Sequence, residues 1–317
     1  MSSVELTGLL VASPIGFMAA LGLLRVCAQD HGVAVGLSWG RSTARLEGID
    51  RDDLIELLEA HLRGRSRAPE FNLAVLKDGQ RGPFVHLREI PPADYRAAAQ
   101  AWRDDARALD FLAGYGTDAV VNDKGFVART RFDFSSGPQH LAQEFRQLAQ
   151  SLDPTEARNL KLHRARVVHG LFGGPYERQH SYGWDPATLL SHAHQPKAPT
   201  HAKPLGQPLL IWLAVESLPL HPVLPVGARR AITTGFVGFS AYAWPQWTEP
   251  MNLAEVRLLR QRAVETLDDL PGIDAVWTSG ITTVSRFGFF LPATRTPSDR
   301  LTTHRFAQVE PPDESST

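Results

Sequence analysis

The chain has 317 residues, of which 43% are hydrophobic and 21% charged, a composition typical of a globular protein with a sizeable core. Its formal net charge of −1 excludes a protein that holds a long stretch of nucleic acid by overall positive charge, so such a role would need a local basic patch or a partner. The single cysteine, Cys27, excludes an intrachain disulfide and a cysteine-rich zinc site, which fits a reducing compartment.

The first predicted elements are a short strand and a buried helix. Residues 4–10 favour the strand, after which Ser13 supplies an N-cap oxygen and Pro14 takes the first helical position. The helix that follows, to about Gln29, is apolar on most sides and should lie inside the fold. This apolar stretch resembles the core of an export signal. No basic residue precedes it, however, and Ser13-Pro14 interrupts it, so we expect a cytoplasmic protein with no membrane association.

Hydrophobic periodicity predicts the elements of the rest of the N-terminal half. They are a strand over 35–39, an amphipathic helix over 50–62, a long helix over 93–112, a strand over 126–134 and a helix over 139–152. Gly114 follows the long helix at the position where a left-handed C-cap is expected.

The middle of the chain is less regular. Residues 186–208 hold five prolines and three histidines without an apolar period, which indicates a loop or linker. Beyond it we predict a buried strand over 209–215, extended chain over 233–247, a helix over 252–270 and one or two strands within 276–291.

The order of these elements predicts the fold class. Strands and helices are interleaved without a strict βαβ order, which indicates an α+β fold with mixed sheet elements, several amphipathic helices and an irregular, proline-rich middle. The proline-rich segment 191–208 would divide the chain into an N-terminal α+β part, 1–190, and a C-terminal part, 209–317. One continuous domain is the alternative.

The linear signatures of common enzymes are absent from the sequence. It contains no G-x-x-x-x-G-K-[ST] loop, no H-E-x-x-H, no G-x-S-x-G and no His-Asp dipeptide of the kind that metal phosphohydrolases use. We therefore predict a protein that binds and assembles without catalysing a reaction, and that uses no cofactor.

Histidines concentrate in the middle of the chain. Six of the twelve lie between His163 and His201, and the spacing of His192, His194 and His201 is compatible with a zinc or other divalent metal site. Without an evident carboxylate or supporting shell beside them, they also fit an ordinary polar loop. This segment supports the alternative function, a metal-dependent hydrolase or nuclease.

Basic residues also gather locally. Between residues 155 and 206, seven Lys and Arg residues stand against three Asp and Glu residues. Arg164 and Arg166 belong to this segment, and Arg129 and Arg131 precede it. These residues could form a face for a nucleic-acid backbone or an ordinary solvated surface.

Two polar turns could bind ligands. The turn at Ser135, Ser136 and Gly137 precedes a predicted helix, whose outward N–H groups form a natural seat for a phosphate or carboxylate. A second turn, 233–235, follows Arg229 and Arg230 and precedes aromatic residues that could stack bases. Ordinary turn chemistry is the simpler interpretation, and we expect the two tryptophans in the core. The aromatic residues are Phe236, Phe239, Tyr242, Trp244 and Trp247.

Several segments, taken in order, resemble one protein family. They are LTGLLVASPIGFMAALGLLRV, ALDFLAGYGTDAVV, RFDFSSGPQH, GLFGGPY, YGWDP, ESLPLHPVLP, TTGFVGFSAYAWPQW and SRFGFFLPA, and they extend from about residue 5 to residue 293. Together they resemble the small proteins encoded with type I-G (formerly I-U) CRISPR systems. These are related at their N-termini to the large-subunit-like protein of that subtype, and some are described as an extension of the helicase-nuclease.

The resemblance implies a non-catalytic subunit of a type I CRISPR complex that acts in RNA-guided DNA interference. Its partners would be other CRISPR complex subunits and guide RNA, target DNA or both. In such systems the protein reads a short DNA flank and backbone shape, while base pairing reads the sequence. A scaffold that contacts only protein is a further possibility. The nucleic-acid contacts that we expect are Arg129, Arg131, Ser135, Ser136, Arg164, Arg166, Arg229 and Arg230.

Overall fold

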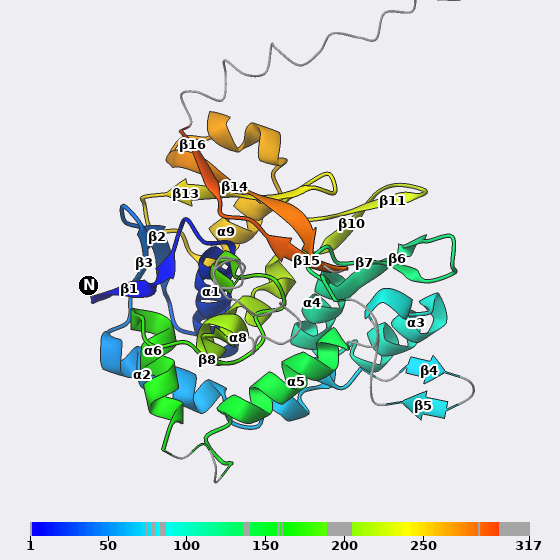
Figure 1. The fold of residues 1–317 in the computed structure, drawn as a ribbon, viewed down its shortest axis with the longest axis horizontal. Helices are drawn as coiled ribbons and strands as arrows, with labels where there is room; N and C mark the ends of the chain where they lie inside the picture. The colour runs from blue at the N-terminus through cyan, green and yellow to red at the C-terminus, as the bar shows by residue number, and fades with distance from the viewer. Residues whose placement is uncertain are drawn as a thin grey trace, which may run out of the picture.

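The computed structural model describes residues 2–73, 75–77, 80–82, 87–135, 140–156, 159, 161–188, 205–284 and 286–297. These residues form the predicted α+β fold, in which small antiparallel sheets and peripheral helices surround a central pair of helices (Figure 1). Among the described residues, no helix combines the length and the apolar character that crossing a membrane requires.

The central pair is α1 (Pro14–Arg25) and α8 (Pro208–Glu216), and every residue of both helices is buried. The local signals of α1 act as predicted, because the Ser13 side chain accepts a hydrogen bond from the Gly16 N–H and Pro14 takes the first turn. A side chain at Gly22 would collide with the Leu213 carbonyl of α8, so the glycine permits the close packing of the two helices.

The prediction of a strand over 209–215 is wrong, because this segment forms the helix α8. A continuous apolar run has neither the twofold period of a strand nor the 3.6-residue period of a surface helix, and composition alone does not separate the two. The segment is apolar on all sides because α8 packs against α1, α5 and α6.

The N-terminal sheet has the strand order β1-β3-β2 and is antiparallel throughout. Helix α6 packs against β1 and against α2, whose N-cap is the Asp50 side chain, as expected for a helix that starts at residue 50. The elements of this part are β1 (Ser3–Leu10), β2 (Gly36–Trp39), β3 (Thr43–Glu47), α2 (Arg51–His61) and α6 (His163–Phe172).

The C-terminal sheet contains the predicted extended chain after residue 233 and the predicted strands after residue 276. Its order is β12-β13-β14-β15, and β16 also pairs with β14. The last predicted helix begins at its capping box as expected but ends ten residues early, and a 3₁₀ turn, Val264–Asp269, follows it. The elements are β12 (Phe236–Val237), β13 (Ala241–Trp247), α9 (Leu253–Arg260), β14 (Ile273–Val284), β15 (Phe287–Phe290) and β16 (Thr294–Pro297).

A third group of elements lies on the right of Figure 1 and includes two neighbouring hairpins, β6–β7 and β10–β11. The long helix predicted over 93–112 is two helices, the second capped by Asp105, and the strand predicted over 126–134 is only three residues long. The elements are α3 (Pro92–Ala101), α4 (Ala106–Tyr115), β6 (Gly116–Val121), β7 (Val127–Arg129), α5 (Leu141–Leu152), β10 (Val223–Gly227) and β11 (Arg230–Thr233). Short pairs β4 (Val75–Lys77) with β5 (Gln80–Gly82) and β8 (Glu177–Arg178) with β9 (Leu205–Gly206) complete the described strands.

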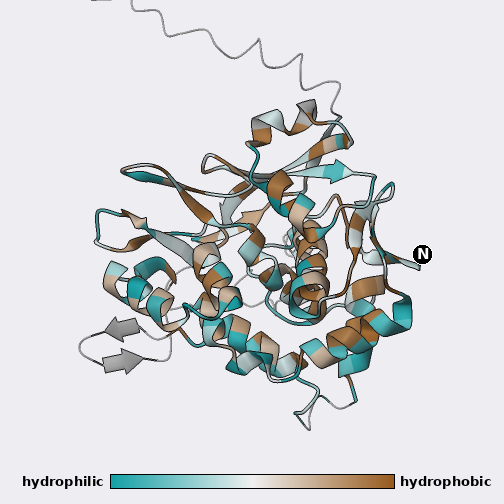
Figure 2. Ribbon diagram, turned by 180° about the vertical axis from the view of Figure 1, so that it is seen from behind, coloured by the Kyte–Doolittle hydropathy of each residue, from teal (hydrophilic) through white to brown (hydrophobic). Residues whose placement is uncertain are grey.

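One hydrophobic core extends through the molecule and includes residues from both 1–190 and 209–317. Hydrophobic residues concentrate on the central helices, and hydrophilic residues cover the peripheral elements (Figure 2). Trp244 and Trp247 are fully buried, as predicted, and their indole N–H groups donate to the carbonyls of Val11 and Leu37. These bonds join the C-terminal sheet to the N-terminal one.

Candidate functional site

A set of charged side chains is buried where three helices end. Arg25 is the last residue of α1, His61 the last of α2 and Glu216 the last of α8. A cation at a helix C-terminus is favourable and a carboxylate there is not, so Glu216 needs the cations around it. We call the whole set the ionic cluster; it consists of Arg25, Asp30, His61, Arg65, Glu70, Arg107 and Glu216.

Glu216 is the centre of the ionic cluster. One carboxylate oxygen accepts from His61 Nε2 at 3.0 Å and from the guanidinium groups of Arg65 and Arg107, each at 3.1 Å. The other oxygen accepts from Arg25 and, at 3.0 Å, from Arg107. Burial by itself would raise the pKa of Glu216, but the three arginines outweigh it and hold the pKa well below the ordinary value. The carboxylate is therefore ionised and fully hydrogen-bonded.

The remaining acids complete the charge balance. Asp30 accepts two hydrogen bonds of 3.1 Å from Arg25, and Arg107 approaches it at 3.1 Å. Glu70 pairs with Arg65 at 2.7 Å. Three guanidinium groups thus face three carboxylates. Burial lowers the pKa of His61 to about 4 although Glu216 acts in the opposite direction, so the imidazole is neutral at pH 7.

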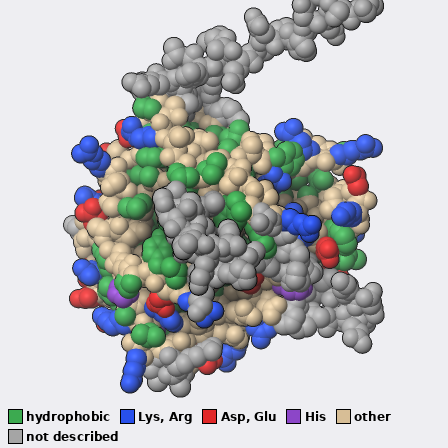
Figure 3. All heavy atoms as spheres, viewed as in Figure 1, with side chains coloured by type: hydrophobic (Ala, Val, Ile, Leu, Met, Phe, Trp, Pro, Cys, Tyr) green, Lys and Arg blue, Asp and Glu red, His purple; other side chains and the backbone are tan. Residues whose placement is uncertain are grey.

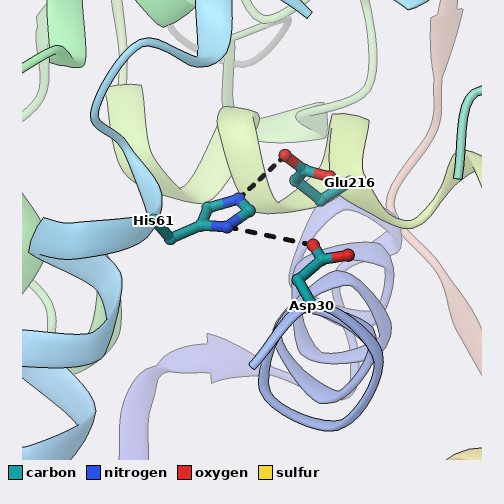
Figure 4. Close-up of side chains that lie close together, drawn as sticks. All are labelled: Asp30, His61 and Glu216. Carbon is teal, nitrogen blue, oxygen red and sulfur yellow. Dashed lines mark hydrogen bonds and ion pairs between the residues drawn. The ribbon is translucent and has the colours of Figure 1, made fainter. Parts of the chain in front are cut away.

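Asp30, His61 and Glu216 are close enough to be tested as a metal site, since one ligand atom from each lies within 4.8 Å of the others (Figure 4). Their chemistry does not fit a metal ion. The carboxylate oxygens of Asp30 and Glu216 already accept hydrogen bonds from arginines. The guanidinium groups that donate these bonds are positively charged and would repel a metal cation placed between the same oxygens. The predicted metal ligands His192, His194 and His201 lie outside the described residues.

The ionic cluster stabilises the fold and lies almost entirely away from solvent, although one of its oxygens, Glu70 Oε2, has no hydrogen-bond partner among the described residues. It joins α1, α2, α4 and α8, and only Arg107, whose side chain is 22% exposed, has substantial contact with solvent. None of the seven residues was among the site residues predicted from the sequence. A signal was nevertheless present, because Arg25 and Glu216 each terminate an otherwise apolar helix, where a charge indicates an internal partner.

Four of the predicted arginines belong to the two neighbouring hairpins or directly follow them: Arg129 ends β7, Arg131 follows it, and Arg229 and Arg230 are at the tip of β10–β11. Strand β6 of one hairpin contacts both strands of the other, β10 and β11. The Arg131 backbone N–H also donates to Thr233 Oγ1 at 2.9 Å. Several basic side chains project over the same region on the right of Figure 3. We call this region the hairpin surface and define it by Arg129, Arg131, Arg229, Arg230 and Phe239.

Arg131 and Phe239 contact each other through both the ring and the backbone of Phe239. The Arg131 guanidinium lies 4.3 Å from the centroid of the Phe239 ring and donates to the Phe239 carbonyl at 2.8 Å. Burial and the neighbouring Arg129 both lower the pKa of Arg131. Burial also lowers the pKa of Arg129. Arg88 lowers it further, whereas Asp133 raises it. Like charges are therefore held close together here.

The other predicted contacts are placed differently. Arg164 and Arg166 lie on α6, on the left of Figure 1, and pair with Glu59 at 3.2 Å and with Glu177 at 2.6 Å. Ser135 lies near the hairpin surface, but its hydroxyl and its backbone N–H both donate to Asp133. Ser136 lies outside the described residues. The six predicted arginines thus form two separate groups.

No protein-family model matches the chain, and no curated protein sequence is significantly similar to it. The resemblance to type I-G CRISPR proteins therefore stays a prediction from the ordered sequence segments.

Proposed function

We propose that this chain is a non-catalytic subunit of a type I CRISPR RNA-guided interference complex, and that it contacts nucleic-acid backbone through the hairpin surface. The ordered sequence segments support the membership of the complex. One structural observation supports the proposed contact with nucleic-acid backbone. Arg131 stacks on the exposed ring of Phe239 and lies beside both Arg129 and the β10–β11 hairpin. Residues 223–240 carry Arg229 and Arg230 and no acidic residue.

Charge pairing supports the choice of the hairpins over α6. The α6 arginines already have carboxylate partners, whereas the described residues place no carboxylate within ion-pair distance of Arg131, Arg229 or Arg230. A phosphate backbone is a row of anions whose binding releases counterions, so uncompensated arginines are the groups that gain most from it.

The contact is tested by reversing charge on β10–β11. The double variant Arg229→Glu/Arg230→Glu should bind labelled oligonucleotides at least about tenfold more weakly at low salt, with a smaller slope of log affinity against log salt concentration. The matched control is Arg41→Glu/Arg45→Glu, which changes the charge equally at two exposed positions of the β2–β3 hairpin in the N-terminal sheet. Equal binding by the two variants, measured by fluorescence anisotropy, would refute the assignment of the contact.

Membership of a complex is tested by co-expression. The tagged chain, produced with the CRISPR genes of its source, should be recovered with other complex subunits and with guide RNA. Recovery of the chain alone, under conditions in which the remaining subunits assemble, would contradict the proposed membership whatever the isolated protein binds.

A further inference from the structure

Phe239 is displayed on a fixed turn. Val237 pairs with Ala241, so residues 238–240 form the connection between β12 and β13, and Gly238 adopts a positive φ of 57° that a residue with a side chain rarely adopts. The Ser240 carbonyl accepts from the Ile281 N–H at 2.8 Å, and the Phe239 carbonyl accepts from Arg131. Hydrogen bonds from other parts of the chain therefore hold two carbonyl groups of the turn, those of Phe239 and Ser240.

The Phe239 ring does not contribute to the core. It is 65% exposed, whereas Phe236 and Tyr242 in the same segment are 6% and 0% exposed. Because Arg131 lies over one face of the ring, the opposite face makes up much of the exposed surface. Single exposed apolar residues are common on proteins, but this one is oriented by the Arg131 guanidinium group, which itself lies close to Arg129.

We infer that the open face of Phe239 stacks on an unpaired base, so that the hairpin surface takes single-stranded nucleic acid. This inference rests on the proposed nucleic-acid contact and specifies its ligand. In a duplex, neighbouring base pairs cover the faces of each base, whereas an unpaired base offers a face to an aromatic ring. Arg131 on the far face of the ring and the base on the near face would form one continuous stack, and Arg129, Arg229 and Arg230 would meet the adjoining phosphates.

The stacking role is tested with Phe239→Ala and Phe239→Trp, using a labelled oligothymidylate and a duplex of the same length as probes. Phe239→Ala should weaken binding of the single strand by about tenfold or more and change duplex binding by less than about twofold. Phe239→Trp should retain tight binding, and its added exposed indole should lose fluorescence when oligothymidylate binds, with the wild type as baseline. Leu258→Ala is the control, because Leu258 is 64% exposed on α9 and should leave both affinities unchanged.

The outcomes separate the inference from the proposed function. A loss on Phe239→Ala restricted to the single strand, together with quenching in Phe239→Trp, supports stacking, and an oligouridylate then shows whether RNA or DNA is preferred. Unchanged single-strand binding by Phe239→Ala, while Arg229→Glu/Arg230→Glu still loses affinity, overturns the stacking inference and leaves the backbone contact standing. Equal losses on single strand and duplex also overturn it. If the wild type binds neither probe at low salt, both the inference and the backbone contact are refuted.

Discussion

The ionic cluster and the hairpin surface both contain a contact between an arginine and an aromatic ring, but the surroundings of the arginine differ. In the ionic cluster, the Arg65 guanidinium lies 5.1 Å from the centroid of the Phe71 ring, and on the hairpin surface the Arg131 guanidinium lies 4.3 Å from that of Phe239. The cluster matches each of its three arginines with a carboxylate and buries the set, whereas the described residues place no carboxylate within ion-pair distance of three of the four arginines on the hairpin surface. The difference indicates that the balance of charge around arginines, and not their density, separates arginines that stabilise the fold from arginines left available to a ligand.

The largest expected effect comes from breaking the balance of the ionic cluster. Glu216→Gln leaves three guanidinium groups facing two carboxylates in the interior, which should lower the free energy of unfolding by about 3–5 kcal/mol. Urea unfolding followed by circular dichroism measures the change. Glu56→Gln, which removes an exposed carboxylate from α2, is the control and should change the free energy of unfolding by less than about 0.5 kcal/mol. Similar curves for both variants would mean that the cluster does not hold the three helix ends together.

Acid should weaken the ionic cluster through His61. Burial lowers its pKa from 6.5 to about 4, so between these values the unfolded chain takes up a proton that the folded chain does not. The stability that neutral His61 contributes is therefore fully present above pH 6.5 and is lost as the pH falls to 4, by about 3 kcal/mol in total. His61→Gln, which does not titrate, should lose correspondingly less stability between pH 7 and pH 4.5 in urea unfolding. An equal loss of stability between pH 7 and pH 4.5 in the wild type and in His61→Gln would exclude His61 as the cause of the acid sensitivity.

The sequence predicts an element well when the signals are local. The start of α1 follows from Ser13 and Pro14, and the start of α9 from the capping box of Asn252 and Glu255, because each signal acts within one helical turn. The helix α8 was mistaken for a strand because its identity depends on its packing against α1, a segment about two hundred positions away that no local pattern registers.

The candidate sites were predictable only in part, for the same reason. Arg25 and Glu216 are 191 positions apart, so their pairing follows from the tertiary fold. Neighbours in sequence also mislead: Arg164 and Arg166 lie in a basic stretch of the chain, yet both are paired. Arg164 pairs with Glu59, 105 positions away, and Arg166 pairs with Glu177, one of the few acids of that stretch. The aromatic segment after residue 235 was recognised, but whether a ring is buried or displayed depends on the turn at Gly238.

The smallest expected effect lies at the boundary of the hairpin surface. Burial, with a contribution from Asp133, raises the pKa of Glu144 from 4.5 to about 7. Because the folded pKa is above the unfolded value, protonated Glu144 contributes stability below pH 4.5, and this contribution is lost as the pH rises through 7. Glu144→Gln should therefore match the wild type at pH 5 and exceed it at pH 8, by about 1 kcal/mol after allowance for partial solvent screening.

Thermal unfolding at the two pH values measures the Glu144 effect, and an equal difference between the proteins at both would contradict it. The result also refines the comparison between the two regions. Asp133 is the carboxylate that pairs with Arg129, at 3.3 Å, and a second ionised acid beside it would compete for the positive charge of the hairpin surface. A Glu144 that stays protonated up to about pH 7 leaves that charge available to a phosphate backbone. In the ionic cluster, arginines offset the effect of burial on the carboxylates. At Glu144 burial prevails, and it removes a negative charge from the neighbourhood of the proposed phosphate contact.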